Sequence, residues 1–254
     1  KKFSTRVWVS VAGIASIFWG SKGYADTVIS VADFGLKPDT RENAVAYVQK
    51  AIEACRGKEP VTLVFPEGRY DFWPQYAHEK NYYETNTYDV FPKRLAMLFE
   101  GLHNITVDGN GSQFIMHDRI QPITVENCDG VTLKNFSIDW DIPLTAQARV
   151  TKVGSDFFEI EINVLESPYI IEDGKLVFVG EGWKSALGSM IEFESDTHFV
   201  VPGTGDLVLG RNWRDYTAVS PRYGIVRLSR KGGFERYPAE GNWLVLRHST
   251  RDHA

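Results

Sequence analysis

Apolar residues recur at helical spacing near the start of the chain, between two short apolar segments. The spacing predicts one helix with a single apolar face, formed by Val45, Val48, Ile52 and Cys55. Asp39 or Thr40 can cap its start, and Gly57 stands where a glycine commonly ends a helix. The segment "VTLVFPEGRY" then predicts a buried strand followed by a sharp turn.

A weak internal repeat follows. "FEGLHNITVDGNGSQFI" aligns with "VENCDGVTLKNFSIDW" at an offset of 26 residues, and Gly, Asn and Asp separate short alternating strands. Such a period is typical of stacked coils in a parallel β-helix. Two successive hairpins are the alternative.

The pattern changes after Pro143. "AQARVTKVGSDFFEIEIN" predicts two strands about a turn, "KLVFVGEGW" predicts another, and "YGIVRLSRKGGFERYPAEGNWLVLRH" predicts two more. We therefore expect an antiparallel β-barrel-like domain over residues 142–246, inserted after a cap and first coils at 26–141. Residues 247–254 would return to the β-helix. Because a solenoid needs about three or more repeats, we expect the N-terminal part of a longer protein.

The first 25 residues resemble an export signal. Basic "KKFSTR" precedes the apolar run "VWVSVAGIASIFWG", and Gly23 and Ala25 have cleavage-site spacing. We expect cleavage, a secreted or periplasmic protein, and no membrane association afterwards; an uncleaved anchor is the alternative. Loss of the four basic residues in this segment lowers the formal charge from −5 to −9. So acidic a chain is not expected to bind nucleic acid.

The cysteine and aromatic contents do little to narrow the choice of fold or function. Cys55 and Cys128 lie far apart and fit neither a metal motif nor a disulfide framework, so both are interpreted as buried small residues. Aromatic residues make up 13% of the chain. They suit a β core and the stacking of sugar rings alike.

Five ordered segments narrow the picture: "GRYDFWPQ", "ITVDGNGSQFI", "IDWDIPLTAQA", "GKLVFVGEGWKS" and "NWLVLRHSTRDHA". Together they resemble glycoside hydrolase family 110, the exo-acting α-1,3-galactosidases. The resemblance implies an all-β fold with a right-handed parallel β-helix, an N-terminal capping helix and an inserted β-barrel. It also implies inverting removal of terminal α-1,3-linked galactose from an oligosaccharide or glycoconjugate, of blood group B or linear α-galactosyl type, and no cofactor. Family members are roughly twice this length.

Asp139 and Asp141 are the first candidate catalytic residues. An inverting glycosidase sets two carboxyl groups about 6.5–9.5 Å apart, and residues two apart on a strand are separated by about 6.6 Å. Alternation places both acids on the outward face and Phe136, Ile138 and Trp140 inward. The pair can therefore be catalytic, contact substrate, or be solvated acids before a proline.

A second charged group lies in "RHSTRDHA". Asp252 is a candidate acid, while Arg247, His248, Arg251 and His253 suit hydrogen bonds to sugar hydroxyls. The histidine spacing does not fit a metal site, so no metal is expected. Ordinary strand-end charges are the alternative.

Trp73 is a candidate sugar-stacking platform, with a turn residue as the alternative. Four other histidines stand isolated and are interpreted as surface or turn residues: His78, His103, His117 and His198.

Two further functions stay open. One is a polygalacturonase or lyase on the same fold, although the acidic motifs of polygalacturonases do not occur in this sequence. The other is a noncatalytic glycan-binding β-helix protein, because fold does not determine function.

Overall fold

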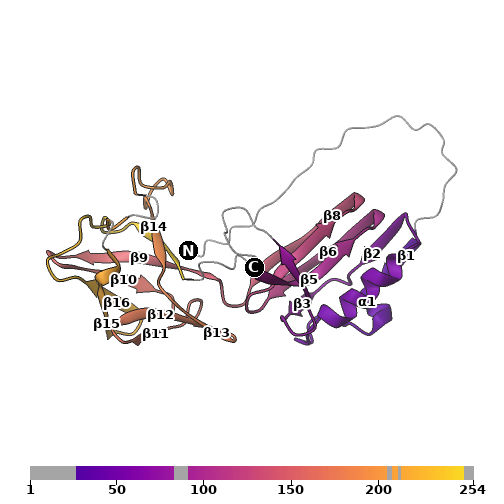
Figure 1. Ribbon diagram of the computed structural model, residues 1–254, viewed down its shortest axis with the longest axis horizontal. Helices are drawn as coiled ribbons and strands as arrows, with labels where there is room; N and C mark the ends of the chain where they lie inside the picture. Colours follow the sequence, from indigo (N-terminus) through magenta and orange to yellow (C-terminus); the bar gives the residue numbers. More distant parts are fainter. Residues whose placement is uncertain (1–26, 83–90, 205–207, 211–212, 249–254) are drawn as a thin grey trace. The chain divides into compact units, whose positions relative to one another are not determined.

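The computed structural model describes residues 27–82, 91–204, 208–210 and 213–248 (Figure 1). These residues form mostly β-strands with one α-helix, in agreement with the all-β prediction. None of their helices has the length and apolar character to cross a bilayer. The predicted export signal lies outside the described residues.

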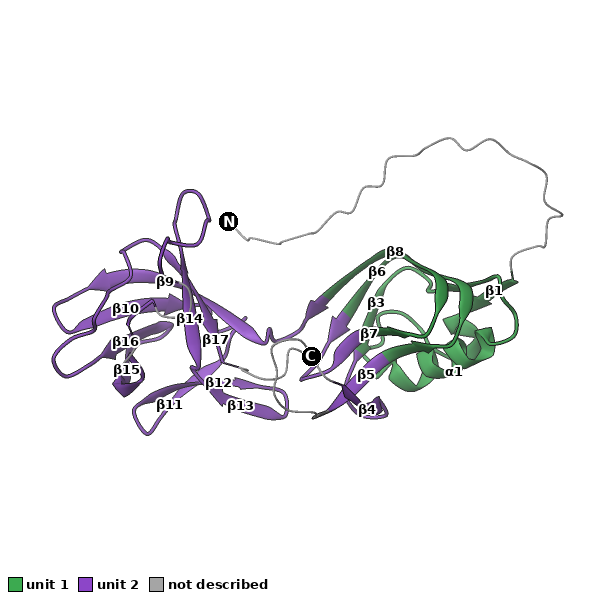
Figure 2. Cartoon of the chain, turned by 45° about the horizontal axis from the view of Figure 1, so that its top comes forward, with its two compact units in different colours: residues 1–71, 97–114, 123–138 green, residues 72–96, 115–122, 139–254 purple. Residues whose placement is uncertain are grey.

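The chain divides into two compact units (Figure 2). Unit 1 comprises residues 1–71, 97–114 and 123–138, and unit 2 comprises residues 72–96, 115–122 and 139–254. Two long strands, β6 (His103–Met116) and β8 (Asp129–Trp140), begin in unit 1 and end in unit 2. The last residues of these strands therefore belong to the same unit as the antiparallel sheets.

Unit 1 begins with β1 (Thr27–Ser30), the short 3-10 helix η1 (Val31–Phe34) and α1 (Val45–Cys55). All four residues of the predicted apolar stripe are buried, which confirms the helix and its inward face. Burial also raises the pKa of the Cys55 thiol to about 11. Cys128 is only partly buried, so its interpretation as a buried residue was too strong.

The predicted helix cap was wrong. Ala44 occupies the cap position of α1, and the backbone N–H of Val45 donates instead to Asn43 Oδ1 at 3.1 Å. Asp39 is engaged elsewhere, because its Oδ1 accepts from the backbone N–H of Arg69 at 2.9 Å. A long-range contact thus takes the side chain that local pattern assigned to the helix. Gly57, with φ of +75°, does lie just beyond the helix end.

Parallel pairing builds the rest of unit 1. β1 pairs in parallel with β2 (Val61–Val64), which pairs in parallel with the first half of β6 at Val61 and Ile105. The sheet order is β1, β2, β6, β3 (Arg69–Phe72), and β8 also pairs with β6.

The repeat segments lie next to each other in this sheet. The backbone N–H of Asp129 donates to Leu102 O at 3.0 Å, and the N–H of Leu102 faces Cys128 Sγ at 3.4 Å. β5 (Phe91–Glu100) and β7 (Gln121–Glu126) lie in a separate sheet with β4 (His78–Tyr82). Within the residues that the structure describes, β5 and β7 belong to a different sheet from β6 and β8, which does not match the alternative of two successive hairpins.

β8 is much less buried than the sequence pattern predicted. Phe136 does stack on Phe114, with ring centroids 4.8 Å apart, but Ile138 is 39% exposed and Trp140 is only partly buried. Among the described strands, β8 pairs with β6 alone. Alternation therefore set the faces of this strand but not the depth at which they lie.

Unit 2 contains the antiparallel region predicted after Pro143. Its larger sheet has the order β14 (Ser189–Phe193), β17 (Trp243–Arg247), β9 (Thr145–Val153), β10 (Phe157–Ile162), β16 (Ile225–Ser229), β15 (Thr217–Arg222). Its smaller sheet has the order β11 (Tyr169–Glu172), β12 (Lys175–Gly180), β13 (Trp183–Ala186). A short 3-10 helix, η3 (Trp213–Asp215), precedes β15.

Alternation along these strands builds one core in unit 2. Ala146, Ala148 and Val150 of β9 are buried, as are Phe158 and Ile160 of β10. The predicted turn between the two strands is closed by the N–H of Gly154 donating to Phe157 O at 2.8 Å. Both strands and their pairing are therefore as predicted.

Candidate functional site

The strands β3, β6 and β8 begin in unit 1 and end in unit 2, and the residue that follows each of them carries the candidate chemistry. Trp73 follows β3, His117 follows β6 and Asp141 follows β8. Backbone hydrogen bonds join these ends: the N–H of His117 donates to Phe72 O at 2.9 Å, and that of Asp141 to Met116 O at 3.0 Å. The pairing of the strands therefore fixes these three residues as neighbours. We call them the strand-end column.

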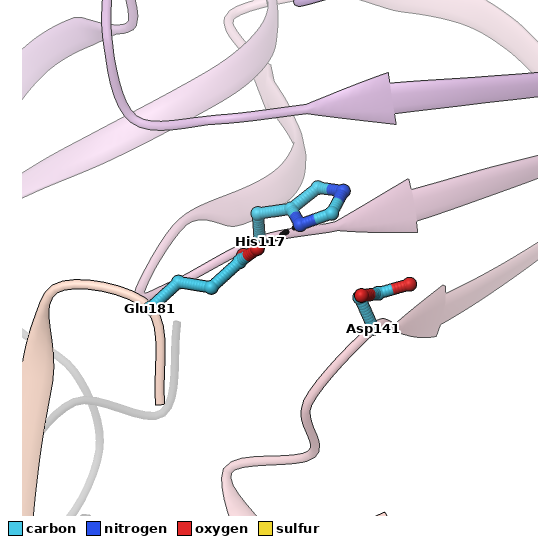
Figure 3. A group of neighbouring side chains, drawn as sticks. All are labelled: His117, Asp141 and Glu181. Carbon is cyan, nitrogen blue, oxygen red and sulfur yellow. Dashed lines mark hydrogen bonds and ion pairs between the residues drawn. The ribbon is translucent and has the colours of Figure 1, made fainter. Parts of the chain in front are cut away.

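His117 is held rigidly in this column. Its side chain is 3% exposed, and its ring lies flat against the indole of Trp73, with centroids 3.8 Å apart and an interplanar angle of 11°. The imidazole Nδ1 lies 2.5 Å from Glu181 Oε2, close enough for an N–H to donate to the carboxylate (Figure 3).

Glu181 comes from the turn between β12 and β13, where a glycine stands on either side of it. Gly182 has φ of +75°, a conformation that favours glycine. A second carboxylate approaches this turn: Asp118 Oδ2 lies 3.1 Å from the point where a Cβ on Gly182 would stand. Asp118 Oδ1 is buried and makes no hydrogen bond, although Arg119 Nε lies 3.8 Å away.

The donor atoms of His117, Asp141 and Glu181 all lie within 4.8 Å of one another (Figure 3). Two carboxylates at that separation repel each other by between about 1 kcal/mol in water and about 3 kcal/mol at an effective dielectric constant of 20. Asp141 is exposed and Glu181 partly so, which places the repulsion toward the lower value. Such a group can hold a cation, share a proton, or accept hydrogen bonds from hydroxyl groups.

The predicted pair Asp139 and Asp141 has two different environments. Asp141 belongs to the strand-end column, whereas Asp139 is exposed and its Oδ1 accepts from the backbone N–H of Trp140 at 2.8 Å. The indole N–H of Trp140 donates to Asp118 O at 3.3 Å. Asp141 is therefore the member of the pair that the fold places among other reactive groups, and catalysis by either acid stays a prediction.

His248 lies in the interior of unit 2. It is 1% exposed, and its ring stacks on those of Phe178 and Trp183 at centroid distances of 4.4 and 4.9 Å. Burial lowers the pKa of His248 to about 4, so the ring is neutral at pH 7. Its Nδ1 and the Nε1 of Trp183 are buried without hydrogen-bond partners. The predicted sugar contact by His248 would require a conformation that exposes it.

The other predicted residues are only partly accounted for. Arg247 is partly buried at the end of β17, opposite Thr145 of β9 and Ser189 of β14. Arg251, Asp252 and His253 lie outside the described residues. Trp73 is partly buried, with one ring face against His117, so its role as a sugar platform stays a prediction.

Two residues of the site were missed from the sequence. His117 was interpreted as a surface or turn residue, which is wrong because it is buried and stacked on Trp73. Its position directly after the apolar end of a repeat strand was the available signal. Glu181 carried no such signal, since it comes from a turn that lies 64 residues from His117 in the chain.

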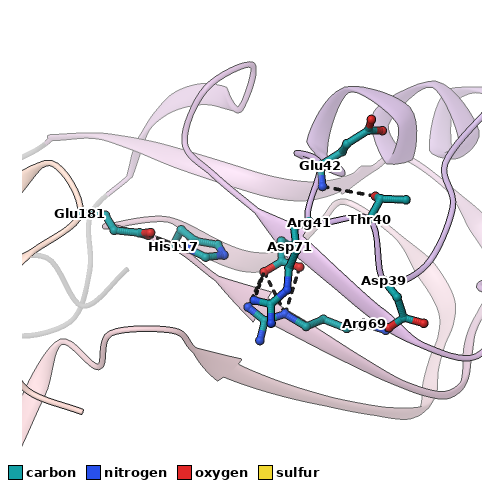
Figure 4. Close-up of polar contacts among 8 residues, drawn as sticks. All are labelled: Asp39, Thr40, Arg41, Glu42, Arg69, Asp71, His117 and Glu181. Carbon is teal, nitrogen blue, oxygen red and sulfur yellow. Dashed lines mark hydrogen bonds and ion pairs between the residues drawn. The ribbon is translucent and has the colours of Figure 1, made fainter. Parts of the chain in front are cut away.

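A different polar cluster belongs to unit 1. Asp71 is buried, its Oδ1 is held by Arg69 Nη2 at 2.5 Å, and Arg41 Nη1 lies 3.7 Å from the same atom (Figure 4). Two guanidinium groups compensate one buried carboxylate, and its backbone oxygen accepts from the N–H of Ala44. This arrangement fixes the segment before α1 onto β3.

Comparison with known proteins identifies relatives of this chain. A family described as GLAA-B beta-barrel domain I matches residues 146–244, which cover most of the antiparallel region of unit 2. The chain is 58% identical to Alpha-1,3-galactosidase B of Bacteroides thetaiotaomicron over 232 residues. This alignment covers 91% of the chain and 37% of that relative. Over most of its length, the chain is therefore similar to part of an α-1,3-galactosidase.

More distant members of the α-1,3-galactosidase family give similar coverage. Alpha-1,3-galactosidase A of Shewanella woodyi is 32% identical, over 88% of the chain and 36% of the relative. Alpha-1,3-galactosidase B of Akkermansia muciniphila is 29% identical, over 97% of the chain and 30% of the relative. The chain thus spans about a third of the length of these α-1,3-galactosidases.

Proposed function

We propose that the protein is an exo-acting glycoside hydrolase that removes terminal α-1,3-linked galactose from glycans with inversion, and that this chain is part of it. The observation that carries the proposal is the 58% identity with an α-1,3-galactosidase B over nearly the whole chain. The substrate would be an oligosaccharide or glycoconjugate ending in α-linked galactose, as the family name of the relatives indicates.

The strand-end column supports a sugar site at this place. Carboxylates accept hydrogen bonds from hydroxyl groups, and an indole offers an apolar face to a sugar ring. Asp141 is exposed next to a buried imidazole, and Trp73 lies in the same column. The proposed role of Asp141 is to contact substrate or act in acid–base chemistry, together with acids elsewhere in the full-length protein.

The proposed architecture is a right-handed parallel β-helix with an inserted β-barrel. Parallel pairing of β1, β2 and β6 and the adjacent repeat segments support the stacked coils. The proposed boundaries are those predicted from sequence, a helix cap and coils at 26–141 and the inserted domain at 142–246. The matched barrel family at 146–244 falls inside the second range.

Export to the periplasm or the medium completes the proposal. The basic, apolar and small-residue regions of positions 1–25 support it. Cell fractionation, with mass spectrometry of the mature N-terminus, tests this separately from activity. A new N-terminus near Asp26 is expected, and recovery of the uncut chain in the membrane fraction would contradict cleavage.

The activity test uses the full-length protein and an oligosaccharide with a terminal α-1,3-linked galactose. Proton NMR during the reaction is expected to show release of galactose, with the β-anomer appearing first because the reaction inverts the anomeric carbon. An α-1,4-linked isomer and polygalacturonate are the controls. Cleavage of polygalacturonate without galactose release would replace this proposal with the pectinolytic alternative, and binding without any cleavage would replace it with the glycan-binding one.

Two matched variants test the site in the same assay. Asp141→Asn is expected to lower kcat/KM by about a hundredfold, within the range of a group that acts in proton transfer. Asp139→Asn is expected to change it only a few-fold, because that side chain already accepts a backbone hydrogen bond. A loss of kcat/KM of about a hundredfold in both variants would instead indicate that the two acids form a catalytic pair.

A further inference from the structure

We propose that His117, Asp141 and Glu181 bind a divalent transition-metal cation of the Zn²⁺ or Mn²⁺ kind. The three side chains come from three separate parts of unit 2: the end of β6, the end of β8 and the turn between β12 and β13. Their donor atoms lie within 4.8 Å of one another. The proposal does not rest on the proposed glycosidase activity, because cation binding is measurable without substrate.

The donor set selects the class of ion. One imidazole nitrogen and two carboxylates suit Zn²⁺, Mn²⁺ and related ions, whereas Ca²⁺ and Mg²⁺ prefer all-oxygen sites. Three protein ligands also leave a position for water or a hydroxyl oxygen, as in open zinc sites.

The observed distances are close to those that an ion requires. Zinc bonds of about 2.0–2.2 Å place two ligand atoms roughly 3.4 Å apart in a tetrahedral arrangement. The separation of 2.5 Å between His117 Nδ1 and Glu181 Oε2 is shorter, and the outer limit of 4.8 Å is longer. An entering ion would therefore replace the imidazole–carboxylate contact, and the two carboxylates would move by roughly 1 Å.

The local structure allows this movement where it is needed. His117 is fixed by the Trp73 ring and by its own backbone hydrogen bond, so it presents a stationary nitrogen. Glu181 lies between two glycines in a turn, and Asp141 is exposed just beyond the end of β8. A rigid imidazole with two adjustable carboxylates favours capture of an ion from solution over a fixed ion pair.

Electrostatics supplies a separate argument. Besides the two carboxylate ligands, Asp118 places a third carboxylate against Gly182, with one buried oxygen that makes no hydrogen bond. Arg119 is the cation near Asp118, at 3.8 Å, and is substantially exposed. A divalent ion would offset the repulsion among these acids, and Asp118 would act on it from outside the ligand set.

The test uses the purified chain, stripped with EDTA and titrated calorimetrically with Zn²⁺ or Mn²⁺ alone. We expect one ion bound per chain. With free ion at about a hundred times Kd, we expect a Tm higher by roughly 5 °C or more. Ca²⁺ and Mg²⁺ are expected to bind more weakly. Titration with Co²⁺, followed by visible absorption, reports whether nitrogen and oxygen ligands surround the ion.

Variants of the three proposed ligands show which residues bind the metal ion. Asp141→Asn and Glu181→Gln are isosteric changes at accessible positions and are expected to weaken binding by about tenfold or more, as is His117→Gln. Glu172→Gln, an exposed change in the same unit, is the matched control and should bind as the parent does. Absence of Zn²⁺ and Mn²⁺ binding, or equal binding in all variants, would overturn the proposal whatever the outcome of the galactosidase assay.

Discussion

Asp71 of unit 1 lies on β3 and Asp141 of unit 2 follows β8, and the surroundings of these two aspartates differ. Asp71 is buried and held by Arg69 and Arg41, whereas Asp141 is exposed next to a buried imidazole and within 4.8 Å of a second carboxylate donor (Figures 3 and 4). A carboxylate compensated by guanidinium groups is committed to the fold. An accessible carboxylate near other donors is available to a ligand.

The largest expected effect tests this contrast directly. Asp71→Asn removes the negative charge between two arginines, and loss of one partner from a buried ion pair costs about 3–5 kcal/mol. Asp141→Asn should change the free energy of unfolding by less than about 0.5 kcal/mol, since its site is exposed. Urea denaturation of both variants measures the difference. Similar losses would show that Asp141 is also structural.

The next largest effect concerns His248, a buried side chain that is neutral at pH 7. The folded pKa of His248 is about 4, below the ordinary value of 6.5, so the unfolded state binds more protons between these values. The stability that comes from neutral His248 is therefore complete above pH 6.5 and is lost as the pH falls toward 4, by at most about 3 kcal/mol.

His248→Phe should remove this part of the pH dependence, because the substituted ring cannot be protonated. Unfolding free energies of parent and variant, measured at several pH values from 4 to 7, give the comparison. His78→Gln, at an exposed position, should follow the parent curve. Parallel curves for the parent and His248→Phe would show that the buried position of His248 does not persist in solution.

A smaller effect is expected at Gly109 of β6, which lies close to β8. A Cβ added at Gly109 would lie 2.5 Å from Phe136 Cβ and 2.7 Å from Asn135 O. Gly109→Ala should therefore cost about 2 kcal/mol through overpacking in unit 1. Ser137→Ala, at an exposed position of β8, is the control and should be nearly neutral. An unchanged free energy of unfolding in Gly109→Ala would mean that β6 and β8 pack less closely in solution.

The smallest effect on the free energy of unfolding is expected for an exposed acid, Glu172. Lys184 and Glu172 form an exposed ion pair at 3.1 Å between β13 and β11. Exposed pairs contribute between about 0 and 1 kcal/mol, so Glu172→Gln should lower the free energy of unfolding by no more than about 0.5 kcal/mol. A loss as large as that of Asp71→Asn would show that exposure does not separate structural from accessible acids in this chain.

Local sequence patterns predicted the elements whose contacts join residues that are near each other in the sequence. The stripe of α1 and the hairpin of β9 and β10 follow from spacing alone, because each is stabilised by residues a few positions apart. The repeat at 26 residues also placed β6 and β8 side by side. The helix cap failed because Asp39 bonds the backbone of Arg69, a contact 30 residues away.

The site was only half predictable for the same reason. Asp141 was a candidate because of its spacing to Asp139, and Trp73 was a candidate as a sugar platform. His117 was overlooked because its significance depends on which strands lie next to β6. Glu181 enters from a turn of the antiparallel region. Its nearness to His117 depends on how the two segments pack, and neither segment carries that information locally.

The strand-end column has a consequence for how such a site changes. The strands β3, β6 and β8 are each followed by one residue of the column, in the order Trp73, His117, Asp141. In the proposed β-helix, insertion or removal of a whole coil would add or remove one residue of this column. In such a fold, the side chains of the strand-end column could be gained or lost one at a time, together with the coil that carries each of them.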